Sequence, residues 1–519
     1  MQRRDLLRMG LGGSAVGAVG TATACAPTTA PTRVFSEGVA SGLHSDTEVV
    51  LWTRVSPQQA NGQFTIGWEV ATDQGFTNVV ASGNATASAA ADHTVKVLAG
   101  GLGADQQYWY RFIHPNEGST VGRARTMPAP GATTSSLKLA FASCQSYNSG
   151  WYTSWRDIAQ RDLDAVLFLG DYIYEAFSIN LLGAVRAGDP TAEAKTLNDY
   201  RTKYRVYRSD PDLQAAHAAH PFVSIWDDHE IVNDYDATIF STDPARSSAA
   251  YQAWFEYMPT WPISANRIYR DLQWGSVGSI FMLDGRQYRD PNTANVPLFG
   301  PVELTSFEAA TGRTMLGATQ RQWLFDGLTD AQANATWKVI GNPVMIAPLR
   351  MEDHDTPEAR AENPNLPLHA GLYTNPMDSF DGYTWERDQI LGHLAANSID
   401  NTVFVTGDYH SFWAATLTSD MDDPVAPKVA NEFAAGAISS AGGAVNENYI
   451  FSNAAWGTWE PGFNYIDGLR NGFGLVECDP SEMEVSFWAH SALSKFSQPV
   501  EAARFTMTDG DPDPAIQVF

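Results

Sequence analysis

Six short apolar runs in the second part of the chain each end in chemically capable side chains, and this recurrence constrains the fold more than any other feature. Each run has the length and the turn-forming boundaries of a buried strand. The runs are LKLAFASC, AVLFLGDYIYE, PFVSIWDDHE, SIFMLDGR, WKVIGNP and NTVFVTGDYH. They end at Cys144, Asp171 with Tyr174, Asp228 with His229, Asp284, Asn342, and Asp408 with His410. Six such endings in order predict a layered α/β sheet with its site at the carboxyl ends of the strands.

Helical patterns lie between these runs. The stretches GWYTSWRDIAQRDL, SSAAYQAWFEYM, ATQRQWLFDGLTDA and TWERDQILGHLAANS carry apolar residues at spacings of three and four, as amphipathic helices do. In the third of them we assign Trp323, Leu324 and Leu328 to the core rather than to a cofactor site. The second part of the chain is therefore expected to be of the α/β class.

In the first part of the chain, the apolar residues recur with a different period. The runs TEVVLWTRV, FTIGWEVA, HTVKVLAG and QYWYRFIH alternate with period two between turn residues, which predicts antiparallel strands. We therefore expect a small N-terminal β-sandwich domain over residues 34–127. A Pro/Gly/Ser-rich linker, PAPGATTSS, follows at 128–136. The catalytic domain is expected over 137–505, with a tail at 506–519 that contains the acidic stretch TDGDPDP.

Residues 1–33 are interpreted as an export signal and leader. Arg3 and Arg4 stand before a weakly apolar, glycine-rich stretch, LGGSAVGAVGTATA, which is typical of a twin-arginine signal and too short for a spanning helix. The twin-arginine translocation machinery is then a partner, and the mature protein is expected to be periplasmic or secreted. Cleavage is expected near residues 22–26. Cys25 could carry a lipid anchor, although Ala22 occupies the position where a lipoprotein signal usually has Leu.

The net charge of the chain limits the classes of molecule that it can bind. With 33 basic and 59 acidic side chains the net charge is −26, which argues against duplex nucleic acid bound on a basic face. An anionic small substrate requires metal ions that reverse the local field. The acidity has an ordinary alternative explanation, the solubility of a secreted protein. Three cysteines in a chain of 519 residues exclude a disulfide framework.

The residue types at the run ends suit metal ions. Asp171, Asp228, Asp408 and His410 offer carboxylate and imidazole ligands for two cations, with Asp171 as the natural bridging carboxylate. A phenolate needs a strongly acidic cation, so Tyr174 indicates ferric iron, and a Cys144 thiolate would strengthen that case. Taken singly, each residue has an ordinary structural explanation: Asp171 as a turn residue, Tyr174 as a packed aromatic ring, and Cys144 as an inert buried thiol. Their repeated placement after strands favours the metal site.

Five separated motifs carry a resemblance to a known family. FASCQSY, LGDYIYE, WDDHEIVND, LDGRQYR and FVTGDYHSFW resemble, in this order, the PhoD-like alkaline phosphatase and phosphodiesterase family. GVASGLHSDTEVVLWTRV resembles its N-terminal domain. The resemblance implies a metallophosphoesterase-like four-layer α/β/β/α sandwich, related to the calcineurin-like enzymes, and a mixed centre of Fe³⁺ and Ca²⁺. Against the wider superfamily, GDYIY replaces GDxxD, DDHE replaces GNHE, GDYH replaces GHxH, and Cys144 replaces an aspartate, which favours iron and calcium over two zinc ions.

The same resemblance assigns roles to single residues. The iron ligands would be Cys144, Asp171, Tyr174, Asp408 and His410. Calcium would be reached by Asp171 and Asp228. His229 would contact the phosphate or protonate the leaving oxygen, the ordinary alternative being a strand-end histidine bonded to a backbone carbonyl.

Further polar residues near the predicted strand ends are assigned more loosely. Asn342 would touch phosphate or metal. Arg286 and Arg289 could clamp an anion or could pair with surface acids. His217 and His220 are not interpreted as ligands, because histidine is favoured at a helix C-terminus in any case.

The expected activity is hydrolysis of phosphate esters by a metal-activated water. No P-loop and no GxSxG motif is present in the sequence, so nucleotide-driven transfer and serine hydrolase chemistry are not supported. Two alternatives remain: a phospholipase D-like enzyme that releases phospholipid head groups, and a non-catalytic surface protein stabilised by metals. The substrates would be small phosphate esters or phospholipids, selected by the loops AFSINLLGAVRAGDP and MEDHDTPEARAENPN.

Overall fold

The computed structural model describes most of the chain from Val34 to Phe519. The described residues are 34–56, 62–176, 184–190, 192–264, 266–291, 312–349, 361, 378–423, 425–441 and 462–519, with the backbone alone at 302–303, 350–353 and 371–373. The predicted leader at 1–33, with Cys25, and large parts of the two entrance loops lie outside them. In the described parts of the chain, no helix combines the length and apolarity needed to span a membrane.

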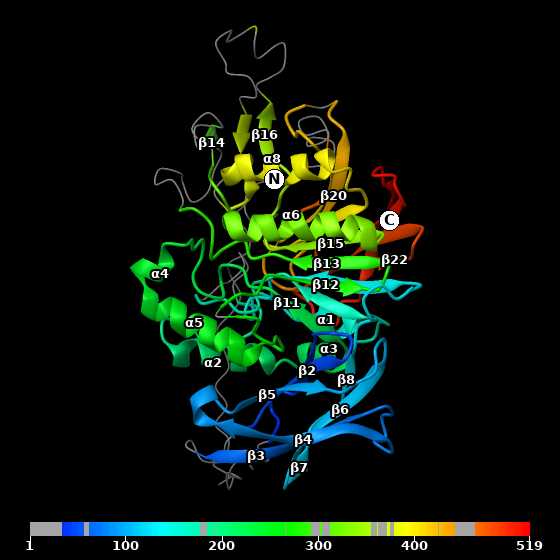
Figure 1. The fold of residues 1–519 in the computed structure, drawn as a ribbon. Coiled ribbons are helices and arrows are strands. Elements are labelled where there is room, and N and C mark those ends of the chain that lie inside the picture. The colour runs from blue at the N-terminus through cyan, green and yellow to red at the C-terminus, as the bar shows by residue number, and fades with distance from the viewer. Residues whose placement is uncertain are drawn as a thin grey trace, which may run out of the picture. The chain divides into compact units, whose positions relative to one another are not determined.

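A ten-stranded sheet carries three of the predicted runs (Figure 1). Its order is β25 (Ala515–Val518), β24 (Val500–Thr508), β23 (Glu482–His490), β22 (Asn471–Cys478), β9 (Leu137–Ala142), β10 (Ala165–Phe168), β11 (Pro221–Ser224), β1 (Val39–Leu43), β2 (Glu48–Arg54) and β5 (Thr94–Gly100). Strands β9, β10, β11 and β1 are parallel. The carboxyl ends of β9, β10 and β11, where three of the predicted runs finish, therefore meet at one edge.

A seven-stranded sheet carries the other three runs. Its order is β12 (Arg270–Trp274), β13 (Gly278–Met282), β15 (Trp337–Asn342), β18 (Thr402–Thr406), β20 (Lys428–Ala434), β19 (Phe412–Thr418) and β21 (Phe463–Asp467). Strands β13, β15, β18 and β20 are parallel. All six predicted strand runs are thus confirmed as strands, three in each sheet.

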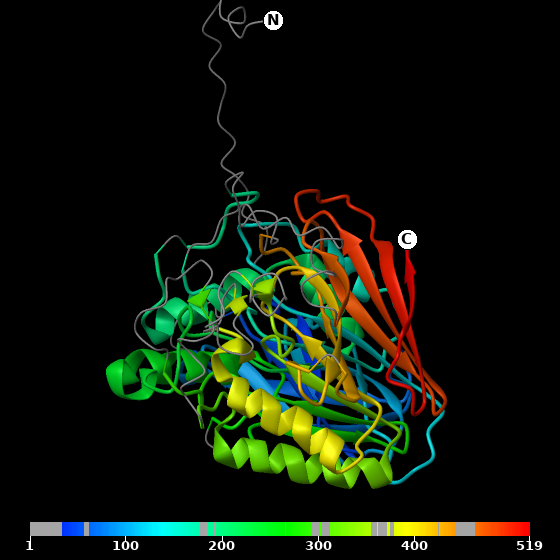
Figure 2. The same cartoon turned by 90° about the horizontal axis from the view of Figure 1, so that it is seen from above.

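Alternation along the strands of the second sheet separates two apolar cores. Val339 packs into one cluster with residues of the ten-stranded sheet, such as Phe141. The next residue, Ile340, points the other way, into a cluster with Leu324 and Ile390 from two helices. The seven-stranded sheet therefore packs against the other sheet on one face and against helices on the other. Figure 2 shows these helices, α6 (Gly317–Asn334) and α8 (Thr384–Ala396), side by side along the strands.

The predicted helices are confirmed. They correspond to α1 (Thr153–Ile158), α5 (Pro244–Tyr257), α6 and α8. Among the described residues, further helices are α2 (Leu197–Arg208), α3 (Pro211–Ala219) and α4 (Ile239–Thr242). The start of α3 is well specified, because Asp210 accepts hydrogen bonds from the N–H groups of Asp212 and Leu213, and Pro211 occupies the first helical position. In α6, Leu324 and Leu328 are fully buried as expected, whereas Trp323 is only partly buried.

The N-terminal strands form a sandwich that shares the main sheet. A five-stranded sheet contains β4 (Val79–Ser88), β3 (Gln63–Ala71), β6 (Gln107–His114), β7 (Glu117–Gly118) and β8 (Gly122–Arg125). Its apolar face packs against residues of β1, β2 and β5, such as Leu51 and Val97. Those three strands extend the ten-stranded sheet, since β1 pairs with β11. The predicted division after residue 127 is therefore not a division between sheets.

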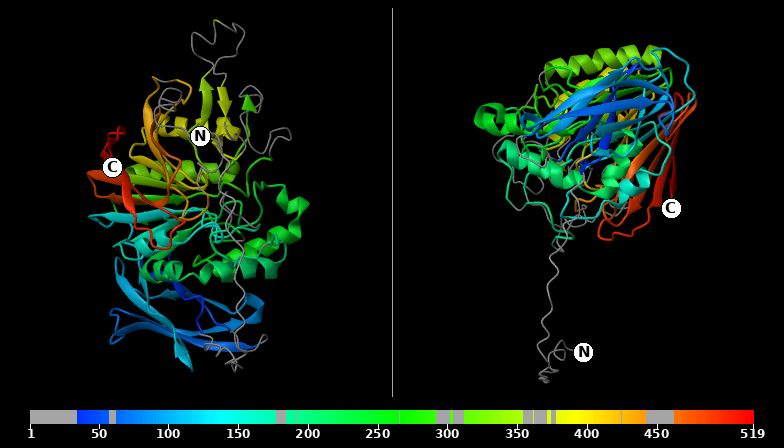
Figure 3. Two further views of the ribbon diagram at one scale, coloured as in Figure 1. Left: turned by 180° about the vertical axis from the view of Figure 1, so that it is seen from behind. Right: turned by 90° about the horizontal axis from the view of Figure 1, so that it is seen from below.

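Part of the stretch predicted as a tail also lies in the main sheet. Strand β24 runs to Thr508, and β25 pairs with it antiparallel from Ala515 to Val518, so much of 506–519 belongs to the sheet. The hairpins of β22 to β25, in orange and red in Figure 3, extend its far edge. A small sheet of β14 (Val302–Glu303), β17 (Gly371–Tyr373) and β16 (Arg350–Asp353), and two 3₁₀ turns at Ala89–Ala91 and Phe380–Tyr383, complete the described elements. The predicted domain limits themselves stay a prediction.

Candidate metal centre

The polar residues at the strand ends adopt an unusual backbone conformation. Cys144, Asp171 and Asp408 follow β9, β10 and β18 closely and have φ values of 59°, 59° and 64°. His410 has a φ of 52°. Positive φ in a residue other than glycine costs on the order of 1–3 kcal/mol and is found mainly where function over-determines the structure. Four predicted metal ligands share this strain, which marks the edge of the sheets as the site.

Two groups of potential ligands share one carboxylate. The first group is formed by Cys144, Asp171 and His410, and the second by Asp171, Asp228 and His229. Within each group the ligand atoms all lie within 4.8 Å of one another. Asp171 belongs to both, which is the arrangement that a bridging carboxylate between two cations requires.

Tyr174 belongs beside the first group. Its side chain is 2% exposed, and its hydroxyl oxygen lies 3.2 Å from Nε2 of His410. His410 donates from Nδ1 to the carbonyl oxygen of Ala441 at 2.8 Å, which leaves Nε2 with the lone pair that a metal needs. Burial lowers the pKa of His410 to about 4, so the imidazole is neutral. The structure thus brings together the thiol, carboxylate, phenol and imidazole predicted for iron.

Asp408 lies close enough to Cys144 for its charge to raise the pKa of that thiol, and it also approaches Arg286. Its Oδ1 is 3.8 Å from Nη2 of Arg286, and it belongs to none of the three-residue groups formed by the described residues. Burial, followed by the charges of Asp378 and Asp227, raises its pKa well above the usual range. Its role as an iron ligand stays a prediction.

Asn342 ends β15 with an unpaired oxygen. The side chain is fully buried, and its Nδ2 donates to the carbonyl oxygen of Val344. Its Oδ1 has no hydrogen-bond partner among the described residues, and neither has Oδ1 of Asp228. Buried oxygens without a donor are costly. A cation is the simplest partner for both, and these residues therefore fit the predicted metal group.

The arginines of the LDGRQYR motif are buried and pair with buried carboxylates. Arg286 is fully buried and pairs with Asp227 and Asp378, and its Nη1 lies 3.8 Å from Oδ2 of Asp228. Arg289 is also buried and reaches Asp378 at 3.0 Å. The acids that pair with them are buried rather than at the surface, and Nε and Nη2 of Arg289 have no hydrogen-bond partner among the described residues, so a contact of Arg289 with an anion stays a prediction. The acids that these arginines neutralise are buried beside the metal-binding groups.

Arg286 and Arg289 also lie beside a third group of potential metal ligands, which consists of carboxylates. Asp228, Asp234 and Asp378 have ligand atoms within 4.8 Å of one another. Burial opposes ionisation of Asp378, but Arg286 and Arg289 outweigh it and lower the pKa of that carboxyl group. Because two guanidinium groups already supply positive charge there, the two groups that share Asp171 are the better candidates for metals.

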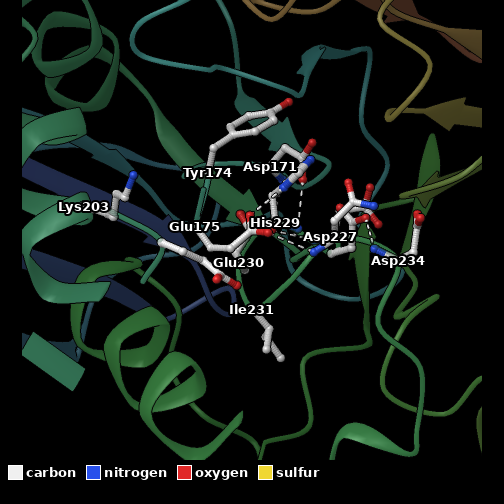
Figure 4. A network of polar contacts seen from close by, with 12 residues as sticks. Asp171, Tyr174, Glu175, Lys203, Asp227, His229, Glu230, Ile231 and Asp234 are labelled. Atoms are coloured by element: carbon white, nitrogen blue, oxygen red, sulfur yellow. Dashed lines mark hydrogen bonds and ion pairs between the residues drawn. The ribbon is translucent and has the colours of Figure 1, made fainter. Parts of the chain in front are cut away.

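His229 belongs to the second group and is held by a carboxylate, that of Glu175, which the sequence analysis did not identify. Its Nδ1 lies 2.7 Å from Oε2 of Glu175, and its ring packs on that of Tyr174 with centroids 4.2 Å apart (Figure 4). Burial lowers the pKa of His229, but the charges of Asp228, Asp171 and Glu175 outweigh it and raise that pKa well above 6.5. The side chain is 21% exposed, so its edge can reach a substrate. The alternative of a histidine bonded to a backbone carbonyl is not what the structure shows.

Glu230 holds the two loops that carry the shared ligands. Its carboxylate accepts hydrogen bonds from the backbone N–H groups of Asp171 at 3.0 Å, of Asp227 at 2.8 Å, and of Tyr172. The bond to Asp227 spans three residues, as in the capping box of a helix. The sequence does contain a signal for this contact, because Glu230 stands three residues after Asp227 at the end of a predicted strand. It was not identified from the sequence.

The site is short of positive charge for its acids. Burial raises the pKa of Asp171 well above the usual range, that of Asp227 to about 8 and that of Glu230 to about 7. Burial and the charge of Asp171 also raise the pKa values of Cys144 and Tyr174. Ionised forms of these groups are stabilised when cations neutralise them. The donor set and its electrostatics both fit bound metal ions.

His217 and His220, which the sequence analysis did not interpret as ligands, have other partners. His217 lies 2.9 Å from the hydroxyl of Tyr172, and His220 lies 2.8 Å from Arg123, so both have structural contacts. Neither belongs to a metal-binding group of the described residues. Cys478 is a buried free thiol, as is Cys144.

Comparison with known proteins identifies the relatives of this chain. The model of the PhoD-like phosphatase family matches residues 139–487, and the model of the N-terminal domain of PhoD-like phosphatases matches residues 20–128. The chain is 36% identical over 428 residues to alkaline phosphatase D of Bacillus subtilis (strain 168), which covers 79% of this chain and 70% of the relative.

Solved structures give the same result for the fold. A structure of PhoD superposes with a TM-score of 0.82 at 32% identity and covers 94% of this chain and 93% of that chain. A purple acid phosphatase, PPD1 from yellow lupin (Lupinus luteus) seeds, matches with a TM-score of 0.54 at 12% identity over 91% of this chain and 74% of that chain. The second match bears on the fold alone, a mixed α/β architecture. With two family models and the relative in agreement, this chain belongs to the PhoD-like phosphatase family and is a hydrolase of phosphate esters.

Proposed function

We propose that this chain is an exported phosphatase or phosphodiesterase that depends on two cations sharing Asp171. The observation that carries the proposal is the membership of Asp171 in both groups of potential ligands. One group offers a thiol, an imidazole and the nearby phenol of Tyr174, a set suited to Fe³⁺, and the other offers carboxylates suited to Ca²⁺. The unpaired oxygens of Asp228 and Asn342 support metal dependence.

The fine architecture is part of this proposal. Two apolar clusters, one between the large sheets and one between the seven-stranded sheet and its helices, support the four-layer α/β/β/α arrangement of the metallophosphoesterases. The likeness to a purple acid phosphatase supports it further at the level of the fold.

The residues around the metal positions have separable tasks. When bound, the two cations supply Lewis acidity that activates water and neutralises phosphate oxygens. His229, protonated and held at Nδ1 by Glu175, donates from Nε2 to the phosphate or to the leaving oxygen. Arg286 pairs with both Asp227 and Asp378, and together with Arg289 it keeps Asp378 ionised without exposing a charge to the substrate. Asn342 supplies a neutral oxygen to metal or phosphate from the end of β15.

The substrate is tested by a direct screen. Protein exported by its own host is analysed for metals and assayed with phosphate monoesters, phosphate diesters and phospholipids, before and after metal removal by a chelator. Release of phosphate or alcohol from mono- or diesters that stops on chelation supports the leading proposal. Release of head groups from phospholipids alone would favour the phospholipase D-like alternative. The non-catalytic alternative conflicts with membership in a family of hydrolases.

Export is proposed on the sequence signal. Arg3 and Arg4 ahead of an apolar stretch support passage through the twin-arginine machinery to the periplasm or the medium, and Cys25 is the residue that could be lipid-anchored. Replacement of both arginines by lysine is expected to leave precursor in the cytoplasm. Unchanged export of that variant contradicts the proposed route, and the mass of the mature N-terminus decides whether Cys25 carries lipid.

A further inference from the structure

One short segment contacts three of the four residues proposed to hold iron. Residues 439–441 follow β20, the parallel strand beside β18. The backbone N–H groups of Ser439 and Ser440 donate to the carbonyl oxygen of Cys144 at 3.3 and 3.2 Å. The carbonyl oxygen of Ala441 accepts from His410, as described above. The remaining contact, from Ser440 to Tyr174, involves a side chain.

The hydroxyl of Ser440 lies at the centre of this segment. Its Oγ is 2.7 Å from the hydroxyl oxygen of Tyr174 and 2.9 Å from the carbonyl oxygen of Cys144. It accepts a hydrogen bond from the N–H of Ser146 at 3.0 Å. The residue is 1% exposed, so water does not compete for these contacts.

Ser440 has one hydroxyl proton and two acceptors for it. A carbonyl oxygen is neutral, whereas a phenolate oxygen on a metal carries negative charge, and hydrogen bonds to charged acceptors are about twice as strong. The proton is therefore donated to Tyr174 when that oxygen binds a cation. The N–H groups that already serve the Cys144 carbonyl keep that oxygen satisfied when the hydroxyl turns away.

We propose that Ser440 is a positioning residue that holds the Tyr174 oxygen on the metal and weakens its electron donation by a hydrogen bond. This inference rests on the proposed function for the presence of a metal, but not on the substrate. Partners of this kind behind a metal ligand typically change metal affinity by about 10- to 100-fold. Ser440 therefore adds to the ligands a residue that the sequence patterns did not mark.

The test is a double-mutant cycle with a matched control. Metal affinity is measured by competition with a chelator for the wild type, Ser440→Ala, Tyr174→Phe and the double variant. Ser440→Ala is expected to weaken binding about 10- to 100-fold, and to have no further effect once Tyr174 is Phe. The control is Ser439→Ala, because Ser439 is equally buried but its hydroxyl donates to the carbonyl oxygen of Ser146. Equal losses from Ser440→Ala in both backgrounds, or losses as large in Ser439→Ala, overturn the proposal.

Two further readouts keep the result interpretable. In protein loaded with ferric iron, loss of the hydrogen bond raises the energy of the phenolate electrons, so Ser440→Ala is expected to move the visible band to longer wavelength. Ser440→Cys, nearly equal in size with a weaker donor, is expected to give a smaller shift, and it replaces Ser440→Ala if that variant does not fold. A band that stays in place in both variants contradicts the proposal. Metal binding that depends on Ser440 in a protein without phosphoesterase activity would contradict the proposed function alone.

Discussion

Glu175 accepts a hydrogen bond from His229 across 2.7 Å, and its second carboxylate oxygen accepts from the backbone N–H of Asn233 at 3.0 Å. A carboxylate fixed at both oxygens fixes the imidazole as well, and it leaves Nε2 free of the contact with Glu175. The pair explains how a strand-end histidine becomes a directed proton donor rather than a packing residue.

Glu175→Gln tests this orientation. The amide keeps the shape of the side chain but lacks the charge that supports a protonated imidazole, so kcat is expected to fall on the order of 10-fold or more while both metals are retained. Kinetics and metal analysis on the same preparation measure the two effects. An unchanged kcat, or loss of metal in parallel with activity, would show that Glu175 does not act through His229.

Glu230→Gln is expected to destabilise the protein and to weaken metal binding together. The amide oxygen can replace only part of a carboxylate that accepts from three backbone N–H groups, and an unsatisfied buried donor costs about 1–3 kcal/mol. Urea unfolding and chelator competition measure the two losses.

Glu432→Gln is the matched control for that variant. Glu432 is also buried, and its carboxylate accepts hydrogen bonds from the N–H groups of Ile346 and Ala347, in the loop after β15, and from the hydroxyl of Thr406 at the end of β18, rather than from the loop of Asp171. It is expected to lose stability with a smaller loss of metal affinity. Equal losses of metal affinity in both variants would argue against a specific role for Glu230.

Tyr174→Phe tests the identity of the iron-side metal. A phenolate on ferric iron gives a visible charge-transfer band, so the wild type is expected to be coloured and the variant to lose or shift its band. Absorption spectra and iron content are compared for both proteins. An active preparation without iron and without colour rules out the assignment of Fe³⁺.

Stability is expected to fall in mild acid because of buried neutral histidines. Burial lowers the pKa of His490 to about 4, against about 6.5 in the unfolded chain, so the unfolded state binds the proton first as the pH falls. The stabilisation is present above pH 6.5 and is lost between about pH 6.5 and 4, by up to about 3 kcal/mol. Urea unfolding at pH 7.5 and 4.5 is expected to show a smaller acid loss for His490→Gln. An identical loss in both proteins contradicts this origin.

The strands of the site could be predicted from the sequence because each apolar run ends at a polar or metal-binding side chain. Cys144, Asp171 and Asn342 end apolar runs that could only be buried strands, and parallel strands bring such ends together. No sequence pattern showed that Asp171 lies in both groups while Asp408 lies beside Arg286. That distinction depends on how two sheets face each other, which is a property of the packing.

The residues that were missed act through the backbone or through long-range contacts. Glu230 receives N–H groups from two different loops, and Ser440 reaches Tyr174 across 266 residues of chain. A serine in the stretch GAISSAGG looks like a loop residue until the neighbouring strand ends are known. The sharing of the main sheet by β1, β2 and β5 was missed for the same reason, because strand partners are not encoded by local periodicity.

The comparison of Asp171→Asn with His229→Ala tests the central claim most directly, by metal stoichiometry and phosphate release measured on the same samples. Asp171→Asn is expected to lose metal and activity together, because an amide cannot bridge two cations with a negative charge. His229→Ala is expected to keep both metals and to lose activity on the order of 10²-fold. An Asp171→Asn protein that retains both metals and full phosphate release would contradict the assignment of Asp171 as the bridge.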